Sequence, residues 1–122
     1  MTGVRSRAVK GAITLGGDVT FGNTNSLNLS SATLTLSGNR LVAVNNGSGS
    51  IVTFGNIVGG TNTLGLSGGG IVTLAGASSN TGGLVTTSLT TLNLSKTSGN
   101  AIGASGLTIT AGTVNSTAAN QI

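Results

Sequence analysis

The short stretch Val72-Thr73-Leu74 decides the fold, because a polar residue stands in it between two apolar ones. Its counterparts Val52-Thr53-Phe54 and Leu92-Asn93-Leu94 lie 20 residues before and 20 residues after it. Such alternation is typical of a short β-strand with one buried and one exposed face. The pattern recurs at Ile13-Thr14-Leu15, Val19-Thr20-Phe21, Leu27-Asn28-Leu29, Leu34-Thr35-Leu36, Val42-Ala43-Val44, Leu64-Gly65-Leu66 and Leu107-Thr108-Ile109.

Two series of apolar residues add a longer period to this alternation. The first comprises Ile13, Leu34, Val52, Val72, Leu92 and Val114, and the second comprises Val19, Val42, Leu64, Leu84 and Leu107. Periods of this length predict a solenoid, because one coil cannot bury its apolar face until neighbouring coils stack on it. We therefore expect an all-β, right-handed parallel β-helix of about five turns, each of about 20 residues.

Two other arrangements are compatible with short, evenly spaced strands. An antiparallel sandwich or barrel would favour two-residue hairpin loops, and the chain offers one candidate, Asn46-Gly47. Most of its glycine clusters are longer, as in Gly68-Gly69-Gly70. A disordered or amyloid-like chain is the third possibility, although disorder is typical of highly charged chains, and only 5% of these residues are charged.

The composition excludes most catalytic chemistry. The chain has 22 glycines, no His, Cys, Pro, Trp or Tyr, and a single acidic residue, Asp18. Acid–base catalysis needs paired titrating groups, and a serine nucleophile needs a base, for which Lys10 and Lys96 are the candidates, neither of them in a motif. Metal ligands are also missing from the sequence. We expect no enzymatic activity, no cofactor and no metal site.

The net charge of +4 reflects the scarcity of acids rather than a basic face. Nucleic-acid binding normally combines clustered bases with aromatic stacking residues, so we expect no nucleic-acid partner. Three bases, Arg5, Arg7 and Lys10, define a basic segment at 1–10, which we expect to be poorly ordered or to act as a cap. The β-helix region follows at 11–122. No apolar run reaches the length of a membrane span, and we expect any export signal to lie outside this chain, as in a fragment of a larger protein.

The segment from Gly68 to Gly83 resembles the autotransporter-associated β-strand repeat, also called the passenger-associated transport repeat. That pattern has Gly-x-Gly, a strand close to Thr-Leu-Thr-Leu, and a closing Ser-Gly-x-Asn-x-Tyr-Thr-Gly-Gly. Asn80 replaces the aromatic residue and Ser78 replaces the usual Asn. The turn residues that match the motif are Gly68, Gly70, Gly76, Thr81, Gly82 and Gly83.

The resemblance is strongest over 68–122, and it implies a passenger domain of a bacterial autotransporter. Such a repeat is expected to build a structural stalk and to assist transport of the passenger across the outer membrane. It implies an extracellular or cell-surface location, with the membrane-anchoring parts elsewhere in the parent protein. Partners would be neighbouring β-helix coils of the parent or other copies of the chain, since uncapped coils expose strand edges.

The outward polar residues suggest a second hypothesis, a binding module similar to an adhesin. Thr33 and Thr35, and likewise Thr108 and Thr110, alternate with apolar residues and predict flat polar ladders. Such ladders could recognise a host glycan, another surface or ice. Thr also suits any exposed strand face, and Asn suits stacked ladders. Because sugar-binding sites usually add an aromatic platform, which this sequence lacks, we expect a structural role for these residues rather than binding.

Overall fold

The computed structural model describes residues 7–22, 25–45, 49–76, 78–80, 85–87, 91–96, 102, 106–117 and 119. Strands and turns, and no helix, make up this part of the chain. Every strand pair in it is parallel. The antiparallel alternative is therefore excluded for the described strands, and the expected parallel solenoid is confirmed.

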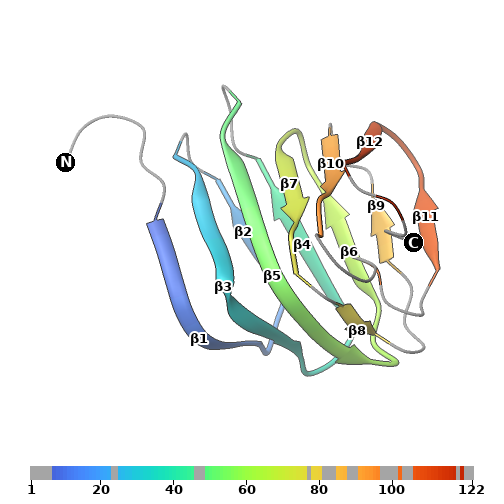
Figure 1. Cartoon of the computed structure of the whole chain (residues 1–122). Coiled ribbons are helices and arrows are strands. Elements are labelled where there is room, and N and C mark those ends of the chain that lie inside the picture. Colours follow the sequence, from blue (N-terminus) through green and yellow to red (C-terminus); the bar gives the residue numbers. More distant parts are fainter. Residues whose placement is uncertain are drawn as a thin grey trace.

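Two sheets form the walls of the solenoid (Figure 1). The first sheet contains, in spatial order, β1 (Arg7–Leu15), β3 (Leu27–Leu36), β5 (Ile51–Gly60), β7 (Ile71–Leu74), β10 (Thr91–Leu94) and β12 (Thr113–Ser116), with β8 (Ser78–Asn80) paired to β5 beside β7. The second sheet contains β2 (Val19–Phe21), β4 (Arg40–Val44), β6 (Leu64–Ser67), β9 (Val85–Thr87) and β11 (Leu107–Ile109).

The chain alternates between the two sheets, so each strand pairs with its counterpart one coil away. In Figure 1 the strands accordingly follow one another from β1 at one end of the stack to β11 and β12 at the other. The shorter ladder, from β2 to β11, corresponds to about four turns. This is one fewer than the sequence suggested.

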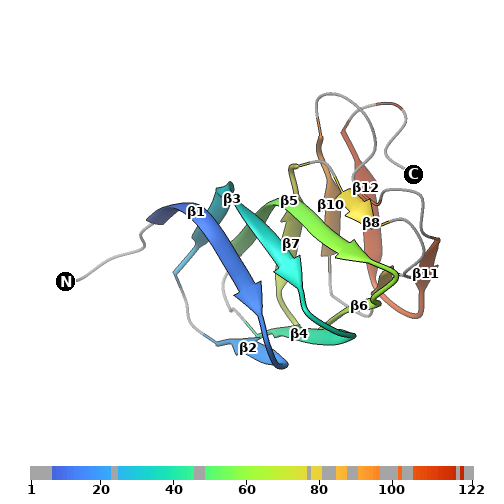
Figure 2. The ribbon, with the colours of Figure 1, turned by 90° about the horizontal axis from the view of Figure 1, so that it is seen from below.

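The long strands β3 and β5 each supply two sides of a coil, because they bend in the middle (Figure 2). The register between them shifts from Leu29↔Phe54 to Thr33↔Asn56. Gly55 lies at this corner, where a Cβ atom would overlap the carbonyl oxygen of Ser30. Only a residue without a side chain allows the two bends to stack so closely.

Because β3 and β5 bend, the first of the two apolar series predicted from the sequence is wrong at one step, from Leu34 to Val52. Leu34 and Val52 do not belong to one column, since Leu34 pairs with Ile57 and Val52 pairs with Leu27. The two residues lie on different sides of the coil, before and after a corner. From Val52 onwards the series holds, with Val72, Leu92 and Val114 in successive register.

The second apolar series predicted from the sequence is also wrong in its middle, at the step from Val42 to Leu64. Val42 pairs with Leu66 rather than with Leu64. Leu64 pairs instead with Val85, and Val85 with Leu107. Leu84, which the period had selected, lies outside the described residues.

The apolar side chains fill the space between the sheets. Alternate residues of each strand point inward, so like residues stack on like from coil to coil. Phe21 of β2 and Phe54 of β5 meet there edge to face, with ring centroids 6.2 Å apart. The buried hydrophobic cluster comprises Leu29, Leu34, Leu36, Val42, Val44, Val52, Phe54, Ile57, Leu64, Leu66, Val72, Leu74, Leu92, Leu94 and Ile102.

Candidate functional surface

The four threonines proposed for binding lie on two different sheets. Thr33 and Thr35 belong to β3 of the first sheet, and both are half-buried. Thr108 belongs to β11 of the second sheet, and Thr110 directly follows that strand; both are exposed. The structure thus brings each pair together along its own strand, and it does not join the two pairs into one surface.

The neighbours of Thr33 and Thr35 do not extend them into a threonine array. Thr33 is flanked by Ala12 on one side and Asn56 on the other. Thr35 is flanked by Thr14 and Val58, and Val58 is 42% exposed. This side of the solenoid is therefore chemically mixed.

A longer polar ladder runs along the outer face of the first sheet, at positions not proposed as a site from the sequence. It consists of Asn28, Thr53, Thr73, Asn93 and Asn115, one from each of five successive strands. We call this set the Asn/Thr ladder. Its sequence signal is the Thr or Asn at the centre of each apolar–polar–apolar stretch, a residue that register places above its counterpart in the coil before.

Hydrogen bonds tie members of the Asn/Thr ladder together. Asn115 Nδ2 donates to Asn93 Oδ1 at 3.0 Å, and Asn93 Nδ2 donates to Thr73 Oγ1 at 3.3 Å. At the other end of the ladder, Asn28 Oδ1 accepts from the backbone N–H of Ser30 at 2.9 Å. These polar groups link coils to each other or stabilise a bend.

A second set of bonds joins the coils at the turn that leads from the first sheet to the second. Asp18 Oδ1 accepts from the backbone N–H of Leu41 at 2.9 Å, and Asn39 Oδ1 accepts from that of Thr63 at 2.8 Å. In both cases the acceptor reaches the residue in register with it on the next coil. The single acidic side chain thus does the same work as an asparagine one coil later.

Arg40 strengthens the same turn from the donor side. Its Nε donates to the carbonyl oxygen of Leu15 at 2.8 Å, and one terminal nitrogen donates to Ser37 Oγ at 2.8 Å. Ser37 Oγ in turn donates to the same Leu15 carbonyl at 3.0 Å. Arg40 therefore holds the end of β1 to the following coil.

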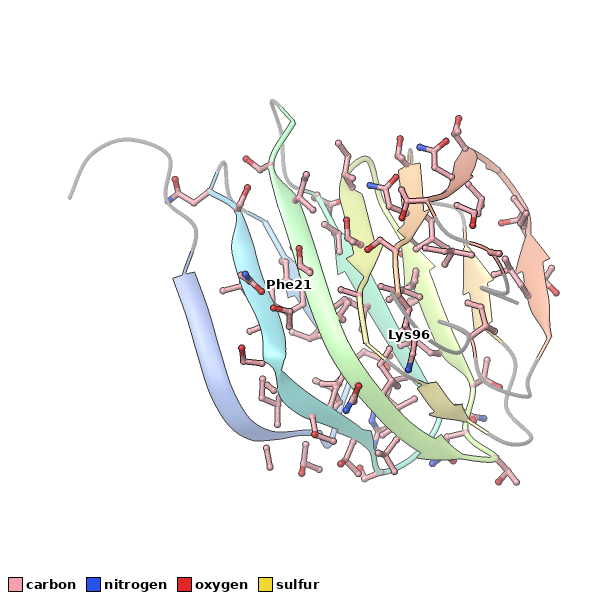
Figure 3. All side chains as sticks on the ribbon, viewed as in Figure 1. Phe21 and Lys96 are labelled. Carbon is pink, nitrogen blue, oxygen red and sulfur yellow. The ribbon has the colours of Figure 1, made fainter. Side chains whose placement is uncertain are left out.

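Asp18, the single acidic residue, and Lys96, a candidate base, lie far apart in the solenoid. Asp18 precedes the first strand of the second sheet, whereas Lys96 follows β10 (Figure 3). The coil that contains Asp18 and the coil that contains Lys96 are four strand steps apart along the first sheet, from β1 to β10. At about 4.8 Å per step, this distance is roughly 19 Å. Over the residues that the structure describes, no group of three or more His, Cys, Asp or Glu side chains gathers as metal ligands would.

The turn residues of the repeat motif are explained by the structure where it describes them. Gly68 has φ +105°, a left-handed conformation, and a Cβ there would overlap the carbonyl oxygen of Val44. Gly70 is buried and donates its N–H to that same carbonyl at 2.8 Å. Gly76 stacks directly on the corner at Gly55. The remaining motif residues, Thr81, Gly82 and Gly83, lie outside the described residues.

The described part of the chain contains no helix that is long and apolar enough to cross a membrane. The basic segment at 1–10 is partly strand, since β1 begins at Arg7. No family model matches the chain, and neither the curated proteins nor the solved structures contain a significantly similar one.

Proposed function

We propose that this chain is a structural segment, a β-solenoid stalk or transport repeat within a surface-exposed, autotransporter-like bacterial passenger, without catalytic activity. The observation that carries the proposal is the use of the polar side chains. Asp18, Asn39, Arg40, Asn93 and Asn115 each bond to an adjacent coil. A chain whose functional groups hold its own coils together is suited to rigid extension.

The location rests on the repeat motif between Gly68 and Gly83. Support comes from the part of the motif that the structure describes, because Gly68, Gly70 and Gly76 occupy places where the solenoid needs glycine or a close backbone contact. These contacts account for the three glycines at these places in this chain. They fit a transport repeat, whose coils have to pack identically along a long passenger.

An adhesin-like module remains the alternative proposal, and exposed threonines favour it at one place. Thr108 of β11 and Thr110, which directly follows this strand, are both exposed, as is Thr113 at the start of β12. The mixed surroundings of Thr33 and Thr35 give no comparable support. If the chain binds a glycan, we therefore expect the site near β11.

Surface labelling tests the proposed location. Antibodies raised against the folded chain are applied to intact cells of the producing bacterium and, as a matched control, to cells with a permeabilised outer membrane. The proposal expects equal labelling of both samples. Labelling that requires permeabilisation would contradict a surface-exposed passenger.

Alanine substitution separates the scaffold from the adhesin. A variant with Thr108→Ala and Thr110→Ala is compared with one carrying Thr33→Ala and Thr35→Ala in a glycan-array and cell-adhesion assay. A scaffold predicts no specific binding in the unmodified chain and no difference between the variants. Binding that disappears only in the first variant, with the β-rich circular dichroism unchanged, would establish the adhesin.

A further inference from the structure

Three asparagines of the Asn/Thr ladder each begin the triplet Asn-x-Ser/Thr, the acceptor sequence for N-linked sugars. The triplets are Asn28-Leu29-Ser30, Asn93-Leu94-Ser95 and Asn115-Ser116-Thr117. A fourth, Asn46-Gly47-Ser48, lies outside the described residues. The triplet is frequent in a chain so rich in Ser and Thr, so the surroundings of each amide nitrogen have to distinguish the acceptors.

The amide nitrogens of Asn93 and Asn115 are both engaged in hydrogen bonds. Asn115 Nδ2 donates to Asn93 Oδ1, and Asn93 Nδ2 donates to Thr73 Oγ1. A glycosyltransferase attaches the sugar to this same nitrogen. Asn93 and Asn115 would therefore have to give up a bond between coils before they could accept a sugar, which makes them poor acceptors in the folded chain.

Asn28 has the opposite arrangement, because its oxygen is bonded and its nitrogen is not. Asn28 Oδ1 accepts from the backbone N–H of Ser30 at 2.9 Å. Asn28 Nδ2 makes no hydrogen bond with any other residue that the structure describes. The Asn28 side chain is half-buried, and Ser30 and Ser31 beside it are exposed. The nitrogen is therefore available to an enzyme that approaches the outer face of the first sheet.

The bond within the first triplet also fixes its shape. An Asn side chain that bonds the backbone two residues further on forms an Asx turn, and this turn brings the amide of Asn28 against Ser30, the hydroxyl-bearing residue of the same triplet. The triplet that begins at Asn93 has the identical sequence Asn-Leu-Ser. There the N–H of Ser95 donates instead to the carbonyl oxygen of Leu74, at 3.0 Å. Two identical triplets thus differ both in turn geometry and in the state of the amide nitrogen.

We propose that Asn28 is a site of N-linked glycosylation and that the folded chain is not modified at Asn93 or Asn115. The co-substrate is a sugar activated at its anomeric carbon by a phosphate or pyrophosphate group, and the partner is a glycosyltransferase. Asn28 Nδ2 forms the new bond to the anomeric carbon, the bond from that carbon to the phosphate oxygen breaks, and one amide proton passes to a base of the enzyme. The amide oxygen keeps its bond to Ser30, so the turn survives the attachment. This site goes beyond the proposed stalk, which requires no sugar.

Peptide mapping of the chain isolated from the organism that produces it tests the site. Trypsin separates the three triplets into different peptides, because it cleaves after Lys10, Arg40 and Lys96. Tandem mass spectrometry with electron-transfer fragmentation should find the added sugar mass on Asn28. Its occupancy should be at least about tenfold higher there than on Asn93 or Asn115, whose nitrogens have to break a hydrogen bond first. An unmodified Asn28, or equal occupancy at Asn28 and Asn93, would overturn the proposal.

Substitutions produced in the same organism separate recognition of the triplet from effects on folding. Ser30→Ala removes the hydroxyl group of the triplet but keeps the backbone N–H that bonds Asn28 Oδ1, so the sugar should be lost while the β-rich circular dichroism stays unchanged. Ser30→Thr keeps a hydroxyl group and should keep the sugar. Asn28→Gln should also remove the sugar, and Asn93→Gln is the matched control that should leave it in place. A sugar that persists on Asn28 in the Ser30→Ala variant would refute the proposal, because the triplet would then not be what the enzyme recognises.

Discussion

Phe21 and Phe54 meet edge to face across the core, their ring planes at 62° and their centroids 6.2 Å apart. Phe54 is 1% exposed, while Phe21 is only partly buried near the first end of the stack (Figure 3). The pair links the two sheets through the two largest apolar side chains of the sequence. Because Phe54 is more deeply buried than Phe21, substituting each of them in turn measures how much more of the stability comes from the middle of the solenoid than from its first end.

Phe54→Ala should lower the free energy of unfolding by about 3–5 kcal/mol, because it removes a fully buried ring and leaves a cavity. Phe21→Ala should cost clearly less, since part of that ring already contacts solvent. Urea denaturation followed by circular dichroism measures both. Equal losses in the two variants would show that the first end of the stack is as well packed as its middle.

Gly76→Ala should destabilise the protein by about 1–3 kcal/mol, a cost typical of forcing atoms into a filled space. Its new methyl group would overlap the backbone of Gly55 and Asn56 where two corners stack. Gly69→Ala is the control, because a Cβ there meets nothing within 4 Å. The midpoint of thermal unfolding should fall for the first variant and not for the second; a fall in both would mean that general loss of glycine, rather than the corner, is responsible.

Asp18→Ala should cost about 0.5–1.5 kcal/mol, the net value of one hydrogen bond, because it removes the acceptor for the N–H of Leu41. Asp18→Asn should retain most of the stability, since the amide oxygen can accept the same bond, as Asn39 does one coil later. Comparing the free energies of unfolding of the two variants, measured by chemical denaturation, separates the contribution of the hydrogen-bond acceptor from that of the negative charge. An Asn variant as unstable as the Ala variant would show that the negative charge is what matters.

Asn93 and Asn115 should show energetic coupling in a double-mutant cycle. Each Asn→Ala substitution breaks their shared bond, so the double variant should lose less than the sum of the single losses, by about 0.5–1 kcal/mol. Thr53→Ala combined with Asn115→Ala is the control cycle, because three strand steps separate these residues. Strict additivity in the first cycle would mean that the bond contributes nothing in solution.

Hydrogen exchange should reveal a gradient along the stack. The amides of Ala75, Ser95 and Thr117 occupy equivalent places, each donating to the coil before it at 2.9–3.0 Å. Local opening costs least where a coil is covered on one side only, so Thr117 should exchange at least about tenfold faster than Ala75 at low protein concentration. Equal rates for all three would indicate that the described coils open as one unit.

The sequence predicted the parallel solenoid and the column through Val52, Val72 and Leu92, because two coils in a row have the same length of 20 residues. It did not predict the bend in β3, since Ser30 and Ser31 resemble a loop in sequence and become a corner only when Gly55 stacks beneath them. The repeat period alone could not decide which of two apolar residues, two positions apart on the same face of a strand, pairs with the residue in the preceding coil. This is why Leu64 was placed where the structure has Leu66.

The candidate site was less predictable than the fold. The Thr or Asn at the centre of each strand was visible in the sequence, but the bonds between Asn93 and its neighbours depend on register across a coil of 20 or 22 residues. The partner of Asp18 is 23 residues away. Alternation along one strand can tell which residues face outward, but not which of them touch across coils.

Each described strand pairs only with strands one coil away. The number of residues between two contacting residues is therefore set by the length of one coil, and not by the number of coils in the molecule. Because folding slows as contacting residues become more distant in sequence, a longer fibre assembled from such loops would need no slower search for its partners than a short one. The solenoid can therefore become longer in evolution by duplication of its coils, while its cross-section and its folding rate stay nearly constant.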